Sequence, residues 1–342
     1  MPDDQREIRS LLLPELTEEF AALGLPPYRA KQVYRWLGRG AGSFGEMSDL
    51  PRDLRDTLAG RYALCRPEVQ RRQVSALDGT VKYLWRLHDG NAVESVVMRY
   101  SYGNTVCISS QVGCRQGCVF CASSGLGLVR DLNAGEMADQ VLFSGLDSGA
   151  KITGIVLMGI GEPLENYDNV RRFLRLANDP EGLNVGMRHI SLSTCGLVPQ
   201  IGRLAEEDLQ ITLSVSLHAP DDETRRKLMP IARRYDMASL MEACLAYWRR
   251  TGRRVSFEYA PIRGVNDSPQ QAKLLAERMR DVHGHVNIIP LNRVPGSALE
   301  PGNAQGFAAR LRELGCNATV RRRLGADIDA ACGQLRRKEA KA

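Results

Sequence analysis

The chain has 342 residues, 43% of them hydrophobic, with a formal net charge of +6. This composition is typical of a folded globular protein and excludes a disordered chain, and the length allows one large domain with an appendage. The charged start, MPDDQRE, is unlike a secretory signal, and no uncharged run approaches the ~20 residues of a membrane-spanning helix. The odd cysteine count of nine favours a reducing compartment over a disulfide framework. We therefore expect a cytoplasmic protein with no membrane partner.

Residues 1–60 are expected to form a small helical module, with helices near 15–20, 28–37 and 51–58. In the second of these, Val33, Trp36 and Leu37 recur at helical spacing, which predicts an apolar stripe that packs against another element. Such a module either caps the next domain or binds nucleic acid, and the sequence leaves both interpretations open.

Residues 61–103 change to strand periodicity and predict a β-hairpin extension. Strand-like runs at 81–87 and 92–98 flank Asp89-Gly90, which is a hairpin signal, and another strand is expected at 105–109.

From 104 to 322, strand-like and helix-like patterns alternate. Asn133 and Glu136 have the spacing of a capping box, so a helix is expected to open there. Repeated strand–helix units predict an α/β fold with a parallel sheet, open or closed into a barrel, whose functional groups lie at the carboxyl ends of the strands. The expected strands of this region are 154–159, 190–194, 211–217, 255–259 and 286–291.

Three cysteines, Cys114, Cys118 and Cys121, follow one another at x3 and x2 spacing. Three thiolates can hold three irons of a cubane [4Fe–4S] cluster and leave the fourth iron open for a substrate. A structural zinc site is the alternative, since Cys107 could supply a fourth ligand, although no second C-x2-C pair is present.

Polar residues also stand at the ends of the expected strands. A ligand explains them economically, because polar groups at such positions are costly unless they are hydrogen-bonded. The alternatives are an ordinary strand-to-loop turn at Gly161-Glu162 and a structural role for His218. The residues are Gly161, Glu162, Ser193, Ser216, Leu217, His218 and Asn292.

Basic residues cluster at four places, 225–227, 233–234, 249–254 and 321–323. A single cluster is more often a solvated helix end than a binding face, but four together favour an RNA partner.

The cysteine trio, with Phe120 inside it and Gly161-Glu162-Pro163 after the next strand, resembles the radical S-adenosylmethionine superfamily. More narrowly, the segments 28–32, 107–114 and 325–335 resemble the RlmN/Cfr group, which methylates adenines of 23S ribosomal RNA. The resemblance implies a partial (β/α)6 TIM-like barrel over 104–322. It also implies an RNA-binding role for 1–60 and a C-terminal tail, 323–342, that carries a catalytic cysteine.

The resemblance further implies two cofactors, a [4Fe–4S] cluster on Cys114, Cys118 and Cys121 and S-adenosylmethionine on the seven polar-end residues. In the family a tail cysteine, matching Cys332, is first methylated, and a second cysteine, matching Cys107, later attacks it to release the product and leave a disulfide. Glu94 matches the family's proton acceptor; on its own it would be interpreted as a solvent-facing strand residue. Cys65, Cys195, Cys244 and Cys316 match no family role and are interpreted as small core residues, with Cys195 close to the ligand.

Pro163 and the helical module favour methylation of carbon 2, and the Cfr-type alternative is carbon 8. The expected partners are 23S ribosomal RNA, tRNA as a second possible substrate, and a flavodoxin-like reductase that donates electrons. The chain is expected to be monomeric. Two other classes stay open: a non-methylating radical enzyme, which the tail around Cys332 disfavours, and a zinc-containing RNA-binding module.

Overall fold

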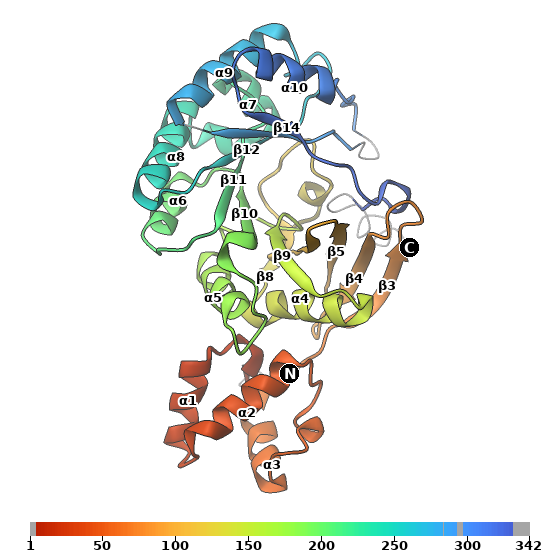
Figure 1. Ribbon diagram of the computed structural model, residues 1–342, viewed down its shortest axis with the longest axis vertical. Helices are drawn as coiled ribbons and strands as arrows, with labels where there is room; N and C mark the ends of the chain where they lie inside the picture. Colours follow the sequence, from red (N-terminus) through yellow and green to blue (C-terminus); the bar gives the residue numbers. More distant parts are fainter. Residues whose placement is uncertain (1–4, 283, 293–296, 331–342) are drawn as a thin grey trace.

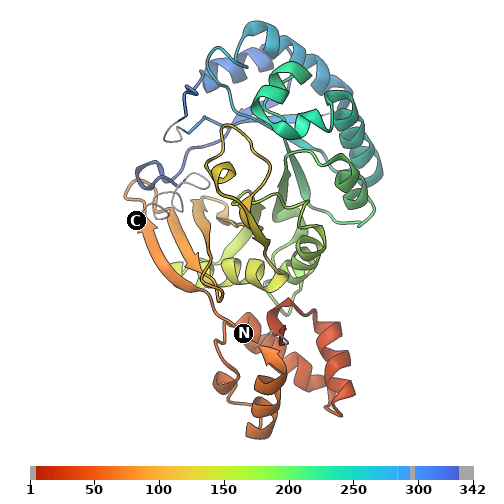
Figure 2. The same cartoon turned by 180° about the vertical axis from the view of Figure 1, so that it is seen from behind.

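The computed structural model describes residues 5–282, 284–292 and 297–330. The chain forms a small helical lobe, drawn in red and orange, beneath a larger α/β lobe (Figures 1 and 2). One ten-stranded sheet runs through the larger lobe in the order β14-β13-β12-β11-β10-β9-β6-β5-β4-β3. In the described part of the chain, no helix is both long and apolar enough to cross a membrane.

The helical lobe contains α1 (Leu13–Ala22), α2 (Pro27–Gly38) and α3 (Arg52–Arg61). A proline stands within one residue of the start of each helix, where its missing N–H costs nothing. The stripe expected on α2 is confirmed, since Val33 and Leu37 are buried and Trp36 packs against the core from a partly buried position. This lobe contacts the barrel through polar groups, among them the buried pair Arg9 and Asp139 and the partly buried hydrogen bond from Tyr34 to Asp179.

The expected hairpin is β4 (Val81–Arg86) and β5 (Ala92–Tyr100), which pair antiparallel and continue into β6 (Gly103–Cys107). A further strand, β3 (Glu68–Val74), pairs with β4 and was not predicted. The reason is that β3 is an almost fully exposed edge strand, so its sequence shows no apolar alternation.

The parallel half of the sheet begins at β6 and continues through six more strands. Each of the first six is followed by at least one helix, which confirms the (β/α)6 arrangement, and β14 adds a seventh strand that was not predicted because it has only three residues. Within the described residues the edge strands β3 and β14 are not paired with each other, so the barrel is partial. The strands after β6 are β9 (Ile152–Leu157), β10 (Ile190–Thr194), β11 (Thr212–Ser216), β12 (Ser256–Tyr259), β13 (His285–Ile288) and β14 (Ala318–Val320).

The helices pack outside the parallel strands (Figure 1). The first of them confirms the expected capping box: the Asn133 side chain accepts from the Glu136 N–H at 2.8 Å, and the Glu136 carboxylate accepts from the Asn133 N–H at 3.0 Å. The helices are α4 (Ala134–Ser148), α5 (Tyr167–Asn178), α6 (Val198–Ala205), α7 (Asp222–Leu228), α8 (Met237–Thr251), α9 (Pro269–Val282) and α10 (Ala304–Glu313).

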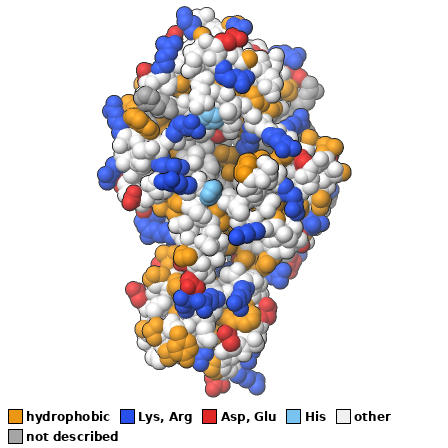
Figure 3. Space-filling view, in the orientation of Figure 1, with side chains coloured by type: hydrophobic (Ala, Val, Ile, Leu, Met, Phe, Trp, Pro, Cys, Tyr) orange, Lys and Arg blue, Asp and Glu red, His pale blue; other side chains and the backbone are white. Residues whose placement is uncertain are grey.

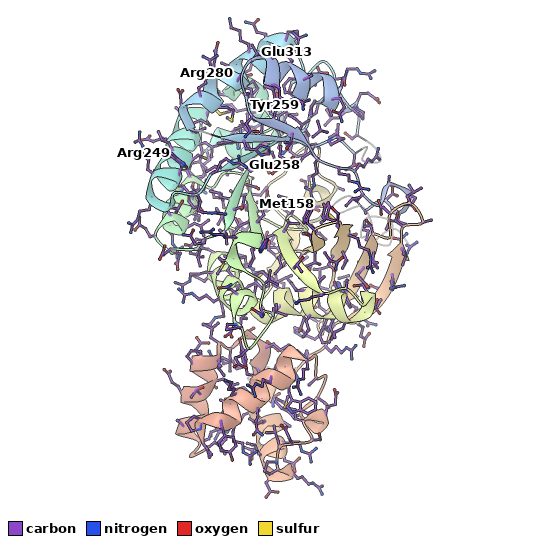
Figure 4. All side chains as sticks on the ribbon, in the orientation of Figure 1. Met158, Arg249, Glu258, Tyr259, Arg280 and Glu313 are labelled. Atoms are coloured by element: carbon purple, nitrogen blue, oxygen red, sulfur yellow. The ribbon has the colours of Figure 1, made fainter. Side chains whose placement is uncertain are left out.

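The two faces of the parallel strands differ in chemistry. On β10 and β11, Leu192, Leu213 and Val215 are fully buried and belong to the main hydrophobic core. The alternate residues are serines, and the hydroxyls of Ser191 and Ser214 lie 3.1 Å apart. Figure 4 places Met158 and Glu258 toward the middle of the larger lobe, whereas Arg249 and Arg280 lie on the outer helices. The inner face of the partial barrel is therefore polar, unlike the branched apolar layers that fill a closed barrel.

Two connections shape the region around the strand ends. A ribbon of β7 (Gln111–Cys114) and β8 (Gly127–Asp131) follows β6 and carries the cysteine loop. After β14, residues 321–330, here called the return segment, lead back to the hairpin extension, where Asp327 accepts from the Ser75 hydroxyl at 2.6 Å and the Lys82 ammonium donates to the Asp329 carbonyl at 2.6 Å.

Candidate active site

A cavity of about 560 Å³ lies at the carboxyl ends of the parallel strands. Its size is that of a small-molecule site. Strand ends from β6 to β14 contribute to its wall, together with the cysteine loop and the return segment. Ten of the residues singled out in the sequence line it: Cys107, Cys114, Cys118, Cys121, Gly161, Glu162, Ser193, Ser216, His218 and Asn292.

The cysteine loop is held by backbone contacts on both sides. Gly113 has φ +82°, and a Cβ there would lie 1.9 Å from the Gly127 carbonyl oxygen, so the ribbon leading to Cys114 can close only on glycine. Beyond it, the Val119 N–H donates to the Leu228 carbonyl of α7 at 3.0 Å. The loop is thus fixed between the ribbon and α7.

Without a bound cation, the thiols of the cysteine loop resist deprotonation. Burial raises the pKa of the Cys114 thiol to about 11 and raises the pKa of the Cys118 thiol further, and the neighbouring cysteine sulfurs add to both shifts. Three thiolates at this place therefore require a bound cation, because a coordinating metal deprotonates thiols outright. Among the described residues, no group of three or more His, Cys, Asp or Glu side chains could hold a single metal ion.

The loop after β9 brings a carboxylate to the cavity wall. Gly161 has φ +111°, and a Cβ there would lie 2.7 Å from the Gln111 side chain, so a glycine is required. The Glu162 carboxylate is buried and accepts from the Cys195 N–H at 2.7 Å and the Leu164 N–H at 3.0 Å. Burial raises the pKa of Glu162, and these two hydrogen bonds oppose that rise. The acceptor is therefore held rigidly between β9 and β10.

His218 is buried at the end of β11 with φ +53°, an uncommon backbone conformation for a residue other than glycine. Its Nδ1 accepts from the Ala260 N–H at 3.0 Å, and its ring contacts Phe120 with centroids 4.5 Å apart. Burial, with a smaller effect of Arg225, lowers the pKa of His218 to about 3. The imidazole is thus neutral, and because Nδ1 accepts, Nε2 carries the proton and is a donor at the cavity wall.

Two of the described site residues, Leu217 and Glu94, do not line the cavity. Leu217 is fully buried beside it, with its N–H bonded to the Glu258 carbonyl at 3.0 Å. Glu94 is 4% exposed, which excludes the solvent-facing interpretation, and its carboxylate lies 3.7 Å from the Lys82 ammonium. Cys332 lies outside the described residues, as does any pairing that involves it; no two of the described cysteines form a disulfide.

Comparison with known proteins agrees with this geometry. Residues 108–275 match the model of the radical SAM superfamily, and residues 7–64 match that of the ribosomal RNA large subunit methyltransferase N-terminal domain. A protein of Alkaliphilus oremlandii named as a probable dual-specificity RNA methyltransferase RlmN is 48% identical, covering 97% of this chain and 98% of that protein. A protein of Symbiobacterium thermophilum with the same name is also 48% identical, covering 98% and 92%.

A solved structure is similar over almost the whole chain. The crystal structure of a radical SAM methyltransferase from Sphaerobacter thermophilus superposes with a TM-score of 0.91 at 46% identity, covering 97% of this chain and 99% of that one. The chain belongs to the RlmN family of RNA methyltransferases. Its cofactors are those of the radical SAM superfamily, a [4Fe–4S] cluster and S-adenosylmethionine.

The side chains that line the cavity have the chemistry needed to bind both cofactors. Its lining includes the three cysteines of one loop together with hydroxyl, carboxylate, amide and imidazole side chains from successive strand ends. The superfamily membership therefore explains both features that the sequence had left with alternatives, the thiol trio and the polar strand ends.

The sequence reasoning missed Glu258. Glu258 lines the cavity from β12, and its carboxylate accepts from the Asn287 amide at 2.8 Å. Its place at a strand end, in register with Ser216, was the signal that could have found it. Cys195, interpreted as a small core residue close to the ligand, is buried and lines the cavity, in agreement with that interpretation.

The basic clusters need one correction. The cluster 225–227 is not a single surface group, because Arg225 is fully buried while Arg226 and Lys227 are exposed. The side chains of 321–323, by contrast, line the cavity. On the face seen in Figure 3, Lys and Arg side chains surround a hollow in the larger lobe, with few acidic side chains among them.

Proposed function

We propose that the chain methylates carbon 2 of an adenosine in 23S ribosomal RNA, with tRNA as a second substrate, through an S-methylcysteine on Cys332. Carbon 2 of adenine is not nucleophilic, so it cannot take the methyl group from S-adenosylmethionine by direct nucleophilic displacement. A carbon radical carried on a cysteine side chain avoids this difficulty.

We assign the cluster to Cys114, Cys118 and Cys121. S-adenosylmethionine is assigned to Glu162, Ser193, Ser216, His218 and Asn292, with Gly161 and Leu217 shaping the backbone around it. When bound, the two cofactors supply a methyl group and a 5′-deoxyadenosyl radical. Glu162 and His218 suit this role because an acceptor and a donor are each fixed by backbone hydrogen bonds before the ligand arrives.

Two cysteines then have separate tasks. Cys332 carries the methyl-derived carbon that adds to the adenine ring, and Cys107 attacks the Cys332 sulfur to release the product. Glu94 accepts the proton lost from the ring, and the Lys82 ammonium at 3.7 Å offers the counter-charge for its carboxylate. Cys107 lines the cavity wall, and Glu94 lies two residues before the cavity-lining Val96 on the same face of β5, which supports these roles.

The observation that carries the proposal is the course of the return segment. Ala330, the last described residue, lines the cavity and packs against the cluster of Val96, Met98 and Cys107. Two residues of chain span at most about 7 Å. The position of Ala330 therefore supports a role for Cys332 in the same cavity as Cys107.

Nucleoside mass spectrometry of RNA treated with the reduced holoenzyme tests the proposal. Wild-type protein is expected to yield 2-methyladenosine, and Cys332→Ala is expected to yield none while still cleaving S-adenosylmethionine. Cys316→Ala, which removes a buried cysteine outside the cavity lining, is the matched control and should methylate normally. Formation of 8-methyladenosine would contradict methylation of carbon 2 and favour the Cfr-type alternative. Methylation by Cys332→Ala would overturn the S-methylcysteine route.

The remaining assignments are predictions: a flavodoxin-like reductase as electron donor, a monomer and a cytoplasmic location. A methylation assay that compares reduced flavodoxin with dithionite, and the mass in solution, check the first two.

A further inference from the structure

Arg225 is a fully buried charge behind the cavity. Its guanidinium donates to the Cys195 carbonyl at 2.7 Å and, more weakly, to the Ser216 and Leu217 carbonyls at 3.3 Å each. These carbonyls lie where β10 and β11 end, beside the residues assigned to S-adenosylmethionine. Arg225 therefore ties two strand ends together.

The positive charge of Arg225 has no carboxylate partner among the described residues. None of the ion pairs there includes it, although it stays protonated even when buried. Its Nη1 is buried and has no hydrogen-bond partner in the described part of the chain. A buried charge without a counter-charge costs several kcal/mol, so an anion is expected near it when the protein is loaded.

The position of α7 indicates which anion this is. The cysteine loop rests on α7 and the turn after it, because the Val119 N–H bonds to the Leu228 carbonyl and a Cβ on Gly117 would lie 3.3 Å from the Pro230 ring. Cys195 links the guanidinium to the cysteine loop, because its carbonyl accepts from Arg225 at 2.7 Å and its thiol donates to the Gln116 amide oxygen at 3.5 Å. A charge on the sulfur of Cys118, a member of the trio assigned to the cluster, would raise the pKa of Arg225 and oppose the lowering by burial.

We propose that Arg225 is the built-in counter-charge of the thiolate-ligated cluster and sets its reduction potential. The inference rests on the assignment of Cys114, Cys118 and Cys121 as ligands. Three thiolates outweigh the positive iron–sulfur core, so the assembly is an anion, and uptake of one electron from a low-potential donor makes it more negative. A fixed cation nearby stabilises the reduced state more than the oxidised state, and net local charge is one of the factors that tune such potentials.

An anaerobic redox titration of the full-length holoenzyme, followed by electron paramagnetic resonance with dithionite and no RNA, tests this. Arg225→Gln and Arg225→Met remove the charge, and Arg225→Lys keeps it. The neutral variants are expected to disfavour reduction about tenfold, which lowers the potential by about 59 mV for a one-electron couple. Arg225→Lys should stay close to wild type.

The matched control is Arg9→Gln, which removes a second buried arginine whose partner, Asp139, lies in the interface with the helical lobe. It should lower the unfolding temperature of the apoprotein and leave the potential unchanged. Neutral Arg225 variants that keep the wild-type potential, or a Lys variant that shifts as far as the Gln variant, would overturn the inference.

Iron content separates this inference from the ligand assignment. A neutral variant that folds as apoprotein but takes up no iron, while Arg225→Lys does take it up, also supports the inference; equal loss in the Lys variant counts against it. If Cys118→Ala retained full iron, the ligand assignment itself would fail. If the ligands stand and the potential does not move, only the role of Arg225 fails.

Discussion

Two buried arginines lie in regions that differ in how the chain compensates a buried positive charge. Arg9, in the interface between the helical lobe and the barrel, is 6% exposed and has its Nε 3.1 Å from a carboxylate oxygen of Asp139. Its other nitrogens donate to the carbonyls of Leu37 and Ala41. Arg225, behind the cavity, is fully buried and bonds only to carbonyl oxygens, with no ion pair among the described residues.

The presence or absence of a carboxylate partner distinguishes a structural interface from a ligand-binding site. In the interface the chain supplies both members of the ion pair. Behind the cavity the chain supplies a cation, thiols whose pKa is raised by burial and a neutral histidine donor, and these groups are balanced only when an anionic ligand is present. The predictions below perturb one region or the other.

The largest effect is expected from Cys118→Ala in the cavity. Loss of one thiolate leaves two protein ligands, so the variant should hold no intact cluster and should neither cleave S-adenosylmethionine nor methylate RNA. Iron analysis and visible absorbance check this against about four irons per chain in wild type. Cys244→Ala, which changes a fully buried cysteine of the core, should cost only about 1 kcal/mol and keep the cluster.

The next effect belongs to the interface. Asp139→Asn removes the counter-charge of Arg9, whose guanidinium cannot lose its proton, and should lower the unfolding free energy by about 3 kcal/mol. Denaturant unfolding measures the change. The double variant Arg9→Met, Asp139→Leu should recover much of the loss; if it is as unstable as the single variant, the charge pairing is not what matters at this joint.

A smaller effect is expected from Gly161→Ala, which places a Cβ 2.7 Å from the Gln111 side chain at φ +111°. The strain should cost about 2 kcal/mol and displace Glu162, so S-adenosylmethionine should bind more weakly. Calorimetric binding to the holoenzyme measures this. Gly202→Ala on α6, where a Cβ meets nothing within 4 Å, should change neither stability nor binding appreciably.

The last effect concerns pH at the interface. Burial raises the pKa of the Glu7 carboxyl from 4.5 to about 7, so between these values the folded protein holds a proton that the unfolded chain has released. Stability should therefore fall as pH rises from 4.5 to 7, by at most about 1.4 kcal/mol per pH unit. Unfolding of wild type and Glu7→Gln across this range checks it, because the difference between them should be flat if Glu7 does not titrate there.

Much of the fold could be predicted because elements with one buried face show a periodic pattern of apolar residues in the sequence. The runs at 190–194 and 211–217 correspond to β10 and β11, which are apolar on the helix-facing side, and the Asn133 cap marked the start of α4. Elements without a buried face, or with very few residues, show no such pattern. The exposed β3 and the three-residue β14 were both missed.

The site was predictable where residue type alone implies chemistry. The spacing of Cys114, Cys118 and Cys121 and the serines at the expected strand ends both indicated ligands. Arg225 was not predictable, because its neighbours Arg226 and Lys227 are exposed and the three together resemble one surface cluster. Only the tertiary structure places its guanidinium under the carbonyls of Cys195 and Ser216.

The most direct test of the account is the fate of RNA on Cys107→Ala. If Cys107 resolves a bond between Cys332 and the adenine, this variant completes every earlier step and stops there. A denaturing gel should then show a covalent, nuclease-sensitive protein–RNA complex, and Cys107→Ala combined with Cys332→Ala should show none. Turnover by Cys107→Ala at the wild-type rate, with no RNA attached, would contradict the account and leave Cys107 as a packing residue.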